Sequence, residues 1–289
     1  MADRVSLAYL LGASAIFLLH WNSGADYRSA VVRNVAFAAF LLLTGRERGR
    51  GLRPEGVRPE ALRPEGVVRG LYPLILTGFI YVQVGLFIHI LFRPPLTFDH
   101  LVERWDAALF GLNPHMWLHR ALPGRFWAEV MHLLYVLFYP LLVWGFLLVL
   151  LRRRHDYERF AFVYICAFLS FCAIFVAFPA DGPMPYRQGL FGGDVLFSNL
   201  VDYLFSHGIP LTGGAFPSAH VGQSVVLLLL LLPLSRFATA AAVLVIIGIG
   251  VSMGYASVHY SIDAVAGAPA GAILYFLWNG VYRRWVRPR

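Results

Sequence analysis

The feature that most constrains this chain is a series of long apolar segments separated by short polar stretches. We count eight of them, at about 5–20, 30–44, 71–92, 127–151, 159–178, 218–234, 238–257 and 260–281. A transmembrane helix needs about 20 apolar residues, and most of these segments approach or exceed that length. Only 14% of the residues are charged, whereas a soluble domain carries roughly 25%. The sequence therefore predicts an all-α polytopic membrane protein with about eight transmembrane helices.

The placement of arginine predicts the orientation of the chain. All 24 Lys+Arg residues are arginines. If both termini are cytoplasmic, the alternation of eight spans places 17 arginines on the cytoplasmic side and 6 on the outer side. Positively charged residues favour the cytoplasmic side of a membrane protein. We therefore expect a multi-pass protein of the plasma (inner) membrane, with its N- and C-termini in the cytoplasm.

A repetitive segment at 45–70 divides the chain. It contains GLRPE, GVRPE and ALRPE in succession, and a proline at every fifth position forbids a continuous helix. We interpret this segment as a flexible cytoplasmic linker, with binding to anionic lipid headgroups as the alternative. The other predicted units are a transmembrane hairpin in 1–44, a six-helix core in 71–282 and a basic cytoplasmic tail in 283–289. The aromatic, charged stretch 93–126 is expected to be partly helical and to lie at the membrane interface.

Two polar motifs lie at the outer ends of apolar segments. The first is GGAFPSAHVG, residues 213–222, in which Ser218 suits the N-cap of the following helix and His220 lies in its first turn. A helix N-terminus presents free N–H groups and a partial positive charge, so it can bind an anion such as phosphate. His220 would be able to give or take a proton beside that anion.

The second motif is SMGYASVHYSIDAVAG, residues 252–267. Its His259 and Asp263 are four residues apart, so a helical turn would place them on one face. A carboxylate bonded to one imidazole nitrogen makes the other nitrogen a better nucleophile. Because the predicted topology puts both motifs outside, we expect His220 and His259 to meet in one active site.

PSAH followed by H-x-x-x-D resembles the signature of the type 2 phosphatidic acid phosphatase superfamily of membrane lipid phosphatases and phosphotransferases. The resemblance covers about 71–281 and implies a six-helix catalytic core, to which the N-terminal hairpin is an addition. It implies that His259 attacks phosphorus and forms a phosphohistidine, and that Asp263 orients it. His220 would protonate the leaving group and then activate the acceptor. No metal and no cofactor are implied.

The chain departs from that family's phosphatase motifs at two cationic positions. Met253 follows Ser252 where the third motif has an arginine. If Arg187 is the arginine of the first motif, Ala180 stands at its lysine position. A phosphomonoester carries nearly two charges and needs several cationic donors, whereas a phosphodiester carries one. The loss therefore shifts the expected substrate toward a phosphodiester or lipid-linked phosphate, with these predicted phosphate ligands: Arg187, Ser218, Ala219 and Ser252.

This pattern is similar to the branch that contains inositol phosphorylceramide and sphingomyelin synthases, and the segment WDAALFGLNP, 105–114, resembles a segment of its bacterial relatives. The resemblance implies transfer of a phospho-headgroup, as by an inositolphosphotransferase, from a membrane phospholipid to an alcohol. One alternative is a phosphatase for phosphatidic acid or polyprenyl phosphate. The other is a non-catalytic scaffold or transporter that keeps the fold.

The remaining polar residues carry weaker predictions. Asp181 and Asp194 lie in the predicted outer loop and are candidates for binding acceptor hydroxyls. Two pairs have the spacing of metal ligands, but no third pair completes a site, so no metal is predicted: His115 with His119, and Glu129 with His132. The expected partners are the lipid substrate and the bilayer, not a nucleic acid, and the oligomeric state is left open.

Overall fold

A computed structural model describes residues 1–21, 26–45, 64–92, 97–111, 113–187, 189–191, 193–207 and 213–285. Its longer helices are α1 (Ala2–Leu19), α2 (Tyr27–Gly45), α4 (Pro64–Leu91), α7 (Arg125–Val136), α8 (Phe138–Arg152), α9 (Tyr157–Ala177), α12 (Ala219–Leu231), α13 (Arg236–Tyr255) and α14 (Ser261–Trp285). The shorter ones are α5 (Asp99–Phe110), α6 (Pro114–Ala121), η2 (Arg154–Asp156), α10 (Met184–Arg187) and α11 (Leu196–His207). No strand occurs in these ranges, so the predicted all-α class is confirmed.

Six helical segments are long and apolar enough to cross a membrane: α1, α4, α7 with α8, α9, α13 and α14. Each of the eight apolar segments of the sequence contains a helix in the structure. α2 forms a helix but is not among the six, and α12 has only 13 residues. At 1.5 Å per residue α12 is about 20 Å long, shorter than a hydrocarbon core of about 30 Å. The six candidate spans identify the chain as a multi-pass membrane protein.

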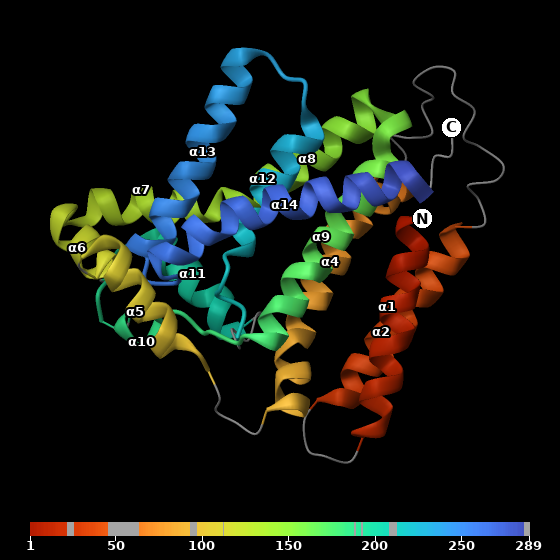
Figure 1. Ribbon diagram of the computed structural model, residues 1–289, viewed down its shortest axis with the longest axis horizontal. Coiled ribbons are helices and arrows are strands. Elements are labelled where there is room, and N and C mark those ends of the chain that lie inside the picture. The colour runs from red at the N-terminus through yellow and green to blue at the C-terminus, as the bar shows by residue number, and fades with distance from the viewer. Residues whose placement is uncertain are drawn as a thin grey trace.

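The centre of the bundle is α9, around which α1, α4, α12 and α14 pack (Figure 1). In α9, 61% of the apolar stretch is buried inside the protein, whereas in the other candidate spans only 22–33% is buried. Aromatic side chains explain this burial, because large rings project from several sides of the helix and fill the spaces between its neighbours. Phe160, Phe162, Phe171 and Phe175 are each at most 2% exposed.

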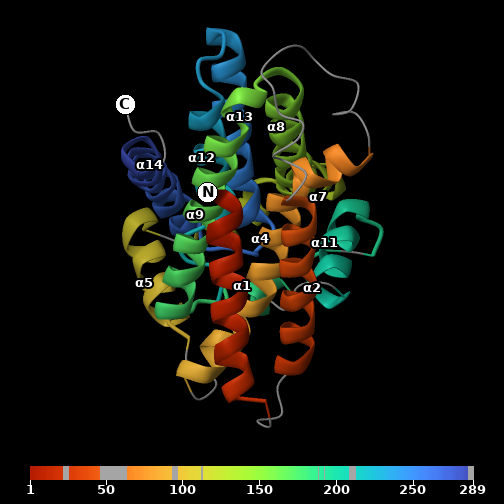
Figure 2. The same cartoon turned by 90° about the vertical axis from the view of Figure 1, so that its right-hand side faces the viewer.

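The N-terminal helices α1 and α2 lie side by side as a hairpin beside α4 (Figures 1 and 2). Their contact with α4 includes buried polar groups. The Gln83 amide donates to Asn34 Oδ1 at 2.7 Å, and the Tyr9 hydroxyl donates to Gln83 Oε1 at 3.2 Å. Because water is absent from the bilayer core, these groups satisfy one another and join the hairpin to the core.

The beginning of α4 differs from expectation. Its first residue is Pro64, so residues 64–70 of the predicted linker are helical. Proline is tolerated there because the first turn of a helix has no intrahelical acceptor for its N–H groups. The rest of the RPE repeat, in 46–63, lies outside the described residues.

Loops that the sequence assigns to one side of the membrane come together in the structure. On one side, the Tyr157 hydroxyl donates to the Gly70 carbonyl at 3.0 Å. On the other, a parallel bridge joins Ala180 to Gly214. The grouping agrees with the arginine alternation.

Short helices cover the second of these groups. The stretch 93–126 contains α5 and α6, as expected of a partly helical segment, and its exposed Trp105, Trp117 and Phe126 suit the depth of lipid headgroups. α11 was not anticipated. It is amphipathic, with Val201 fully buried and Tyr203 exposed, and it lies beside α7.

Candidate active site

The second polar motif forms the connection between α13 and α14. α13 ends at Tyr255, and Ser257 adopts a positive φ of 53° in the tight turn that follows. The Val258 N–H donates to the Met253 carbonyl at 3.1 Å, which closes the turn. This turn carries His259 to the start of α14, where the residue is 5% exposed.

His259 and Asp263 form the pair that their spacing predicts. His259 Nδ1 lies 3.1 Å from Asp263 Oδ2, and the Tyr260 N–H donates to the same oxygen at 3.0 Å. An ionised carboxylate only accepts hydrogen bonds, so we assign the ring proton to Nδ1. The Nε2 lone pair is then available as a nucleophile.

His220 approaches this pair from α12. Its ring centroid lies 5.6 Å from that of His259, and rings of α7 and α8 surround it, with Tyr135 at 5.2 Å and Phe138 at 4.5 Å. Ser218 is the N-cap of α12, and its hydroxyl accepts from the Val221 N–H at 3.4 Å. The structure thus brings together the two histidines that the sequence analysis placed in one site.

The backbones of α12 and α14 are in close contact beneath the histidines. The Ser218 N–H donates to the Asp263 carbonyl at 2.9 Å. A Cβ added at Gly267 would lie 2.5 Å from the Ser218 carbonyl oxygen, and one at Gly271 would lie 2.2 Å from that of Gly222. Glycine is therefore required at both positions of α14, and this approach sets the distance between the helix that carries His220 and the helix that carries Asp263.

We expect Gly267→Ala to lower turnover about 100-fold, because a shift of about 1 Å between catalytic groups has an effect of that order. The added methyl group meets a backbone oxygen, which cannot rotate away as a side chain can. Activity assays and thermal unfolding in detergent would measure the effect. Gly280→Ala is the matched control on the same helix, because a Cβ there has nothing within 4 Å. Equal behaviour of the two variants would contradict this account of the helix contact.

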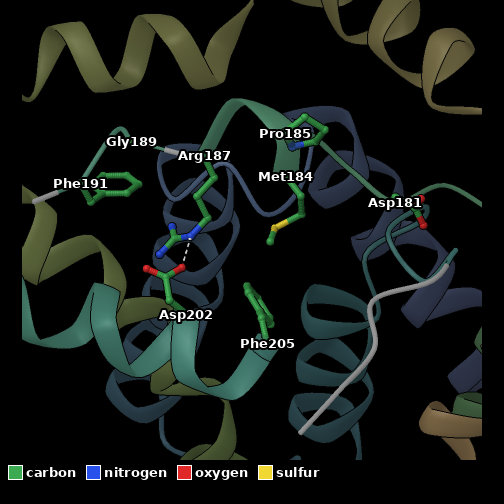
Figure 3. Close-up of a pocket in the computed structure, with 8 residues that line it drawn as sticks. All are labelled: Asp181, Met184, Pro185, Arg187, Gly189, Phe191, Asp202 and Phe205. Atoms are coloured by element: carbon green, nitrogen blue, oxygen red, sulfur yellow. Dashed lines mark hydrogen bonds and ion pairs between the residues drawn. The ribbon is translucent and has the colours of Figure 1, made fainter. Parts of the chain in front are cut away.

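Two cavities lie at this end of the bundle, and the histidines line one of them. The catalytic cavity, of about 10 Å³, is lined by His220 and His259 together with Tyr81, Tyr135, Asp181, Phe205, Gly214, Ala215 and Val258. The outer pocket, of about 670 Å³, is lined by Asp181, Met184, Pro185, Arg187, Gly189, Phe191, Asp202 and Phe205 (Figure 3). Asp181 and Phe205 belong to both, so the two cavities are neighbours.

Arg187, the predicted cationic phosphate ligand, lines the outer pocket and is 5% exposed. Its Nε donates to Asp202 Oδ1 at 2.8 Å, and its Nη2 donates to the Ser198 hydroxyl at 2.8 Å. Its Nη1 donates to the Ala256 carbonyl at 2.6 Å and lies 2.9 Å from His132 Nε2. Arg187 therefore anchors the turn that precedes His259, and a direct contact with phosphate stays a prediction.

The other predicted phosphate ligands occupy different environments. Ser218 and Ala219 begin α12, where the first N–H groups have no intrahelical acceptors. Ser252 is fully buried, and its hydroxyl donates to the Ile249 carbonyl at 2.7 Å. Met253, at the position of the missing arginine, lies with its sulfur 3.5 Å from the Ser218 hydroxyl.

The two candidate acceptor carboxylates are separated by the structure. Asp181 lines both cavities, and its Oδ1 accepts from the Gly213 N–H at 2.6 Å. Burial raises the pKa of the Asp181 carboxyl. Asp194 lines neither cavity; its side chain is 67% exposed and lies 3.8 Å from Arg125. Position in the same loop therefore did not imply position in the same site.

The two residue pairs with the spacing of metal ligands, His115 with His119 and Glu129 with His132, make contacts with different parts of the protein. His115 packs against the rings of Tyr186 and Tyr260, and desolvation lowers the pKa of its imidazole. Glu129 accepts from the first N–H groups of α11, and His132 bonds to Arg187. No three His, Cys, Asp or Glu residues of the described chain form a group that could hold a metal.

Asp106 is a buried residue near the candidate site that the sequence did not single out. It is 1% exposed on α5, and its Oδ1 accepts from the Ile262 N–H, across 156 residues, at 2.7 Å. Burial raises the pKa of the Asp106 carboxyl to about 6. Because Ile262 directly precedes Asp263, Asp106 positions the start of α14 and the carboxylate that orients His259. The segment WDAALFGLNP contained this aspartate, but no local pattern connected it to α14.

We expect the melting temperature of the wild type to rise relative to Asp106→Asn, by about 2–4 °C, as the pH falls from about 7 to about 5. The raised pKa means that the ionised carboxyl disfavours the folded protein above pH 6. Protonation removes that cost at lower pH, whereas the unfolded chain stays ionised down to its ordinary pKa. The asparagine keeps the acceptor for Ile262 without titrating. Parallel melting curves across this pH range would contradict the assignment.

Two histidines, one of them bonded to a carboxylate, thus lie beside a helix N-terminus, an arrangement that is compatible with nucleophilic catalysis. A family model described as the PAP2 superfamily matches residues 100–277, more than half of the chain. The protein therefore belongs to the PAP2 superfamily. No curated protein and no solved structure gives a significant match to it.

Proposed function

We propose that this protein is a phospho-headgroup transferase that acts on a membrane phospholipid through a phosphohistidine at His259. The observation that carries the proposal is the arrangement of three side chains. His259 Nδ1 is held by Asp263 at 3.1 Å, and the His220 ring stands 5.6 Å away in the first turn of another helix. The nucleophile and the proton carrier of this proposal line one cavity, and the orienting carboxylate bonds to the nucleophile.

The reaction would proceed in two steps. In the first, the Nε2 lone pair of His259 bonds to phosphorus, the bond from phosphorus to the diacylglycerol oxygen breaks, and His220 gives that oxygen a proton. The headgroup stays on phosphorus. In the second, an acceptor alcohol oxygen bonds to phosphorus, the phosphorus–nitrogen bond breaks, and the acceptor's proton passes to His220. Water in place of the alcohol would make the reaction a hydrolysis.

The electrostatics support a substrate with one negative charge on its phosphate. The N-terminus of α12 offers N–H groups and a partial positive charge. Met253 replaces the arginine of the phosphatase motif, and the donors of Arg187 already bond to protein acceptors. For Arg187 to bind the substrate directly, phosphate would have to take the place of one of these acceptors. A diester needs fewer cationic donors than a monoester, which agrees with the likeness to the inositol phosphorylceramide and sphingomyelin synthase branch.

A panel of labelled phospholipids tests the reaction class. Purified protein in detergent would be incubated with phosphatidylinositol, phosphatidylcholine or phosphatidic acid, with and without diacylglycerol as an acceptor alcohol. We expect exchange of a labelled phospho-headgroup from a diester onto the added alcohol. Rapid release of phosphate from phosphatidic acid, with no reaction of diesters, would instead identify a phosphomonoester phosphatase.

We propose that the site opens to the extracytoplasmic side of the plasma (inner) membrane, with both termini in the cytoplasm. The support is the arginine asymmetry together with the grouping of the loops. Reporter fusions at the C-terminus and in the loop before α12 would test this orientation, because each reporter is active on one side only. Activity of both reporters on the same side would contradict it.

A further inference from the structure

The Phe205 ring lies at the junction between the two cavities. Among the described residues, it shares with Asp181 the property of lining both the outer pocket and the catalytic cavity. In the view of Figure 3, the ring projects from α11 between the Arg187–Asp202 pair and Asp181. Asp181 is itself held in place, because its Oδ1 accepts from the Gly213 N–H at 2.6 Å. An aromatic ring and a fixed carboxylate therefore divide the outer pocket from the histidines.

The two cavities differ in their access to water. The outer pocket, of about 670 Å³, is open to solvent, because the Asp202 side chain on its wall is 55% exposed. The catalytic cavity, of about 10 Å³, is close to the minimum volume for one water molecule, about 10–15 Å³. His259 on its wall is 5% exposed. Phe205 therefore stands between a space that water can fill and one that is almost closed.

Contacts on one face of α11 fix the position of this ring. Ser198, Asp202 and Phe205 follow a spacing of four and then three residues, so they lie along the same side of the helix. Arg187 donates to the Ser198 hydroxyl and to Asp202 Oδ1, both at 2.8 Å. The start of α11 is held separately, because Glu129 accepts from its first two N–H groups at 2.9 and 3.0 Å. The helix that carries the ring is therefore anchored at its start and along its pocket face.

The ring also packs against the wall of the catalytic cavity. Its centroid lies 6.5 Å from that of Tyr135, and the Tyr135 ring lies 5.2 Å from that of His220. An apolar ring suits a barrier to water because it offers no hydrogen bond, whereas a bound water needs two to four polar partners. The path from the outer pocket to the histidines is thus closed by a group that water does not solvate.

A headgroup transferase needs such a barrier, because water competes with the acceptor alcohol in the second step. A water oxygen would bond to phosphorus, the phosphorus–nitrogen bond to His259 would break, and a proton of the water would pass to His220. The phospho-headgroup would then leave as a free product. Polar partners for this water are present in the catalytic cavity, so access is what limits hydrolysis. Closing an active site to water prevents this kind of loss of a reactive intermediate.

We propose that Phe205 decides between transfer and hydrolysis, because its ring separates the water of the outer pocket from the phosphohistidine at His259. This inference rests on the proposed function, since it names the residue that makes the second step specific for an alcohol. Removing the ring would join the two cavities. A benzene-sized space holds several water molecules, because the share of liquid volume of each is about 30 Å³.

Product analysis of Phe205→Ala tests the barrier. Purified protein in detergent would be incubated with headgroup-labelled phosphatidylinositol or phosphatidylcholine, whichever the wild type uses, and with diacylglycerol of a different chain length. Transfer gives a labelled lipid with the new chains, and hydrolysis gives a free labelled phospho-headgroup. We expect the ratio of hydrolysis to transfer to rise about tenfold in Phe205→Ala, because water gains access to the intermediate.

Two further variants control for changes in α11. Tyr203→Ala also removes an aromatic ring from this helix, but Tyr203 is 60% exposed and lines neither cavity. We expect it to keep the wild-type ratio. Phe205→Leu keeps part of the apolar bulk, so its ratio should rise less than that of Phe205→Ala. Thermal unfolding in detergent shows whether each variant is folded, and Phe205→Leu carries the comparison with Tyr203→Ala if Phe205→Ala does not fold.

Three results would overturn the proposal. An unchanged ratio with unchanged rates would show that the ring does not limit the access of water. Equal loss of both products would show that Phe205 only supports packing. Equal gain of both would show that the ring obstructs the lipid substrate and not water.

Chemical labelling separates this proposal from the proposed reaction. Diethyl pyrocarbonate acylates an imidazole nitrogen that has an available lone pair, and mass spectrometry of the peptide that contains His259 measures the rate without turnover. We expect this labelling to be about tenfold faster in Phe205→Ala than in Tyr203→Ala, because the reagent also needs access to the closed cavity. Faster labelling in a protein that transfers no headgroup would refute the proposed function alone. Equal labelling of the two variants, with headgroup transfer intact, would refute the barrier alone.

Discussion

Replacing His259 by alanine should reduce turnover by about 10⁴-fold or more, the size of loss seen when a covalent nucleophile is removed. The reason is geometric: His259 is the ring that Asp263 orients within the catalytic cavity, with His220 as its neighbour at 5.6 Å. Without it, the first step has no nitrogen to attack phosphorus. The measurement is headgroup transfer from a labelled lipid, together with trapping of an acid-labile phospho-adduct on the protein.

A control variant shows whether the loss is specific. His100 is an exposed histidine on α5, and neither cavity includes it. His100→Ala should therefore keep both turnover and the trapped adduct. If His259→Ala also kept them, the phosphohistidine mechanism would be wrong. If neither wild type nor variant turned over any lipid, the scaffold or transporter alternative would be favoured.

Replacing His220 by alanine should reduce turnover of natural lipids by about 10²–10⁴-fold, the usual contribution of a general acid or base. His220 serves both steps, first by protonating the leaving oxygen and then by taking the acceptor's proton. A substrate with an acidic leaving group, such as an aryl phosphodiester, needs no proton in the first step. With that substrate, His220→Ala should release a burst of one equivalent of phenolate and accumulate the phospho-adduct.

The burst distinguishes a proton carrier from a merely structural histidine. His220 packs against Tyr135 and Phe138, so its loss also removes ring contacts. A packing defect would slow both steps for every substrate and would leave no adduct. Slow release of phenolate without a burst would therefore contradict the assignment of His220 as the base of the second step.

Local sequence patterns predicted the proposed reacting groups because each pattern lies within a few residues. Ser218 and His220 share the start of one helix, and His259 with Asp263 share the start of another. The grouping of both motifs at one end of the bundle followed from the alternation of apolar segments. α11 was missed because it has only 12 residues and polar side chains interrupt its apolar ones, so the segment looked like a loop.

The surroundings of the reacting groups depended on contacts between distant segments. Asp106 caps α14 from 156 residues away, and Arg187 meets His132 from 55 residues away. Nothing near Asp194 in the sequence distinguished it from Asp181, yet only Asp181 lines the cavities. Pairings of this kind are properties of helix packing, which local periodicity does not encode.

The sequence by itself determined the membrane class and the all-α fold, and it identified the three residues on which the proposed mechanism depends. Long apolar segments can satisfy their backbone only as helices in a bilayer, and the catalytic motifs are read within single helical turns. The tertiary structure alone decided how far apart the two histidines lie, where Arg187 directs its donors and where the outer pocket forms. These features arise where α7, α10, α11 and the turn before α14 meet, because a cavity is defined by side chains from separate helices and not by any one segment.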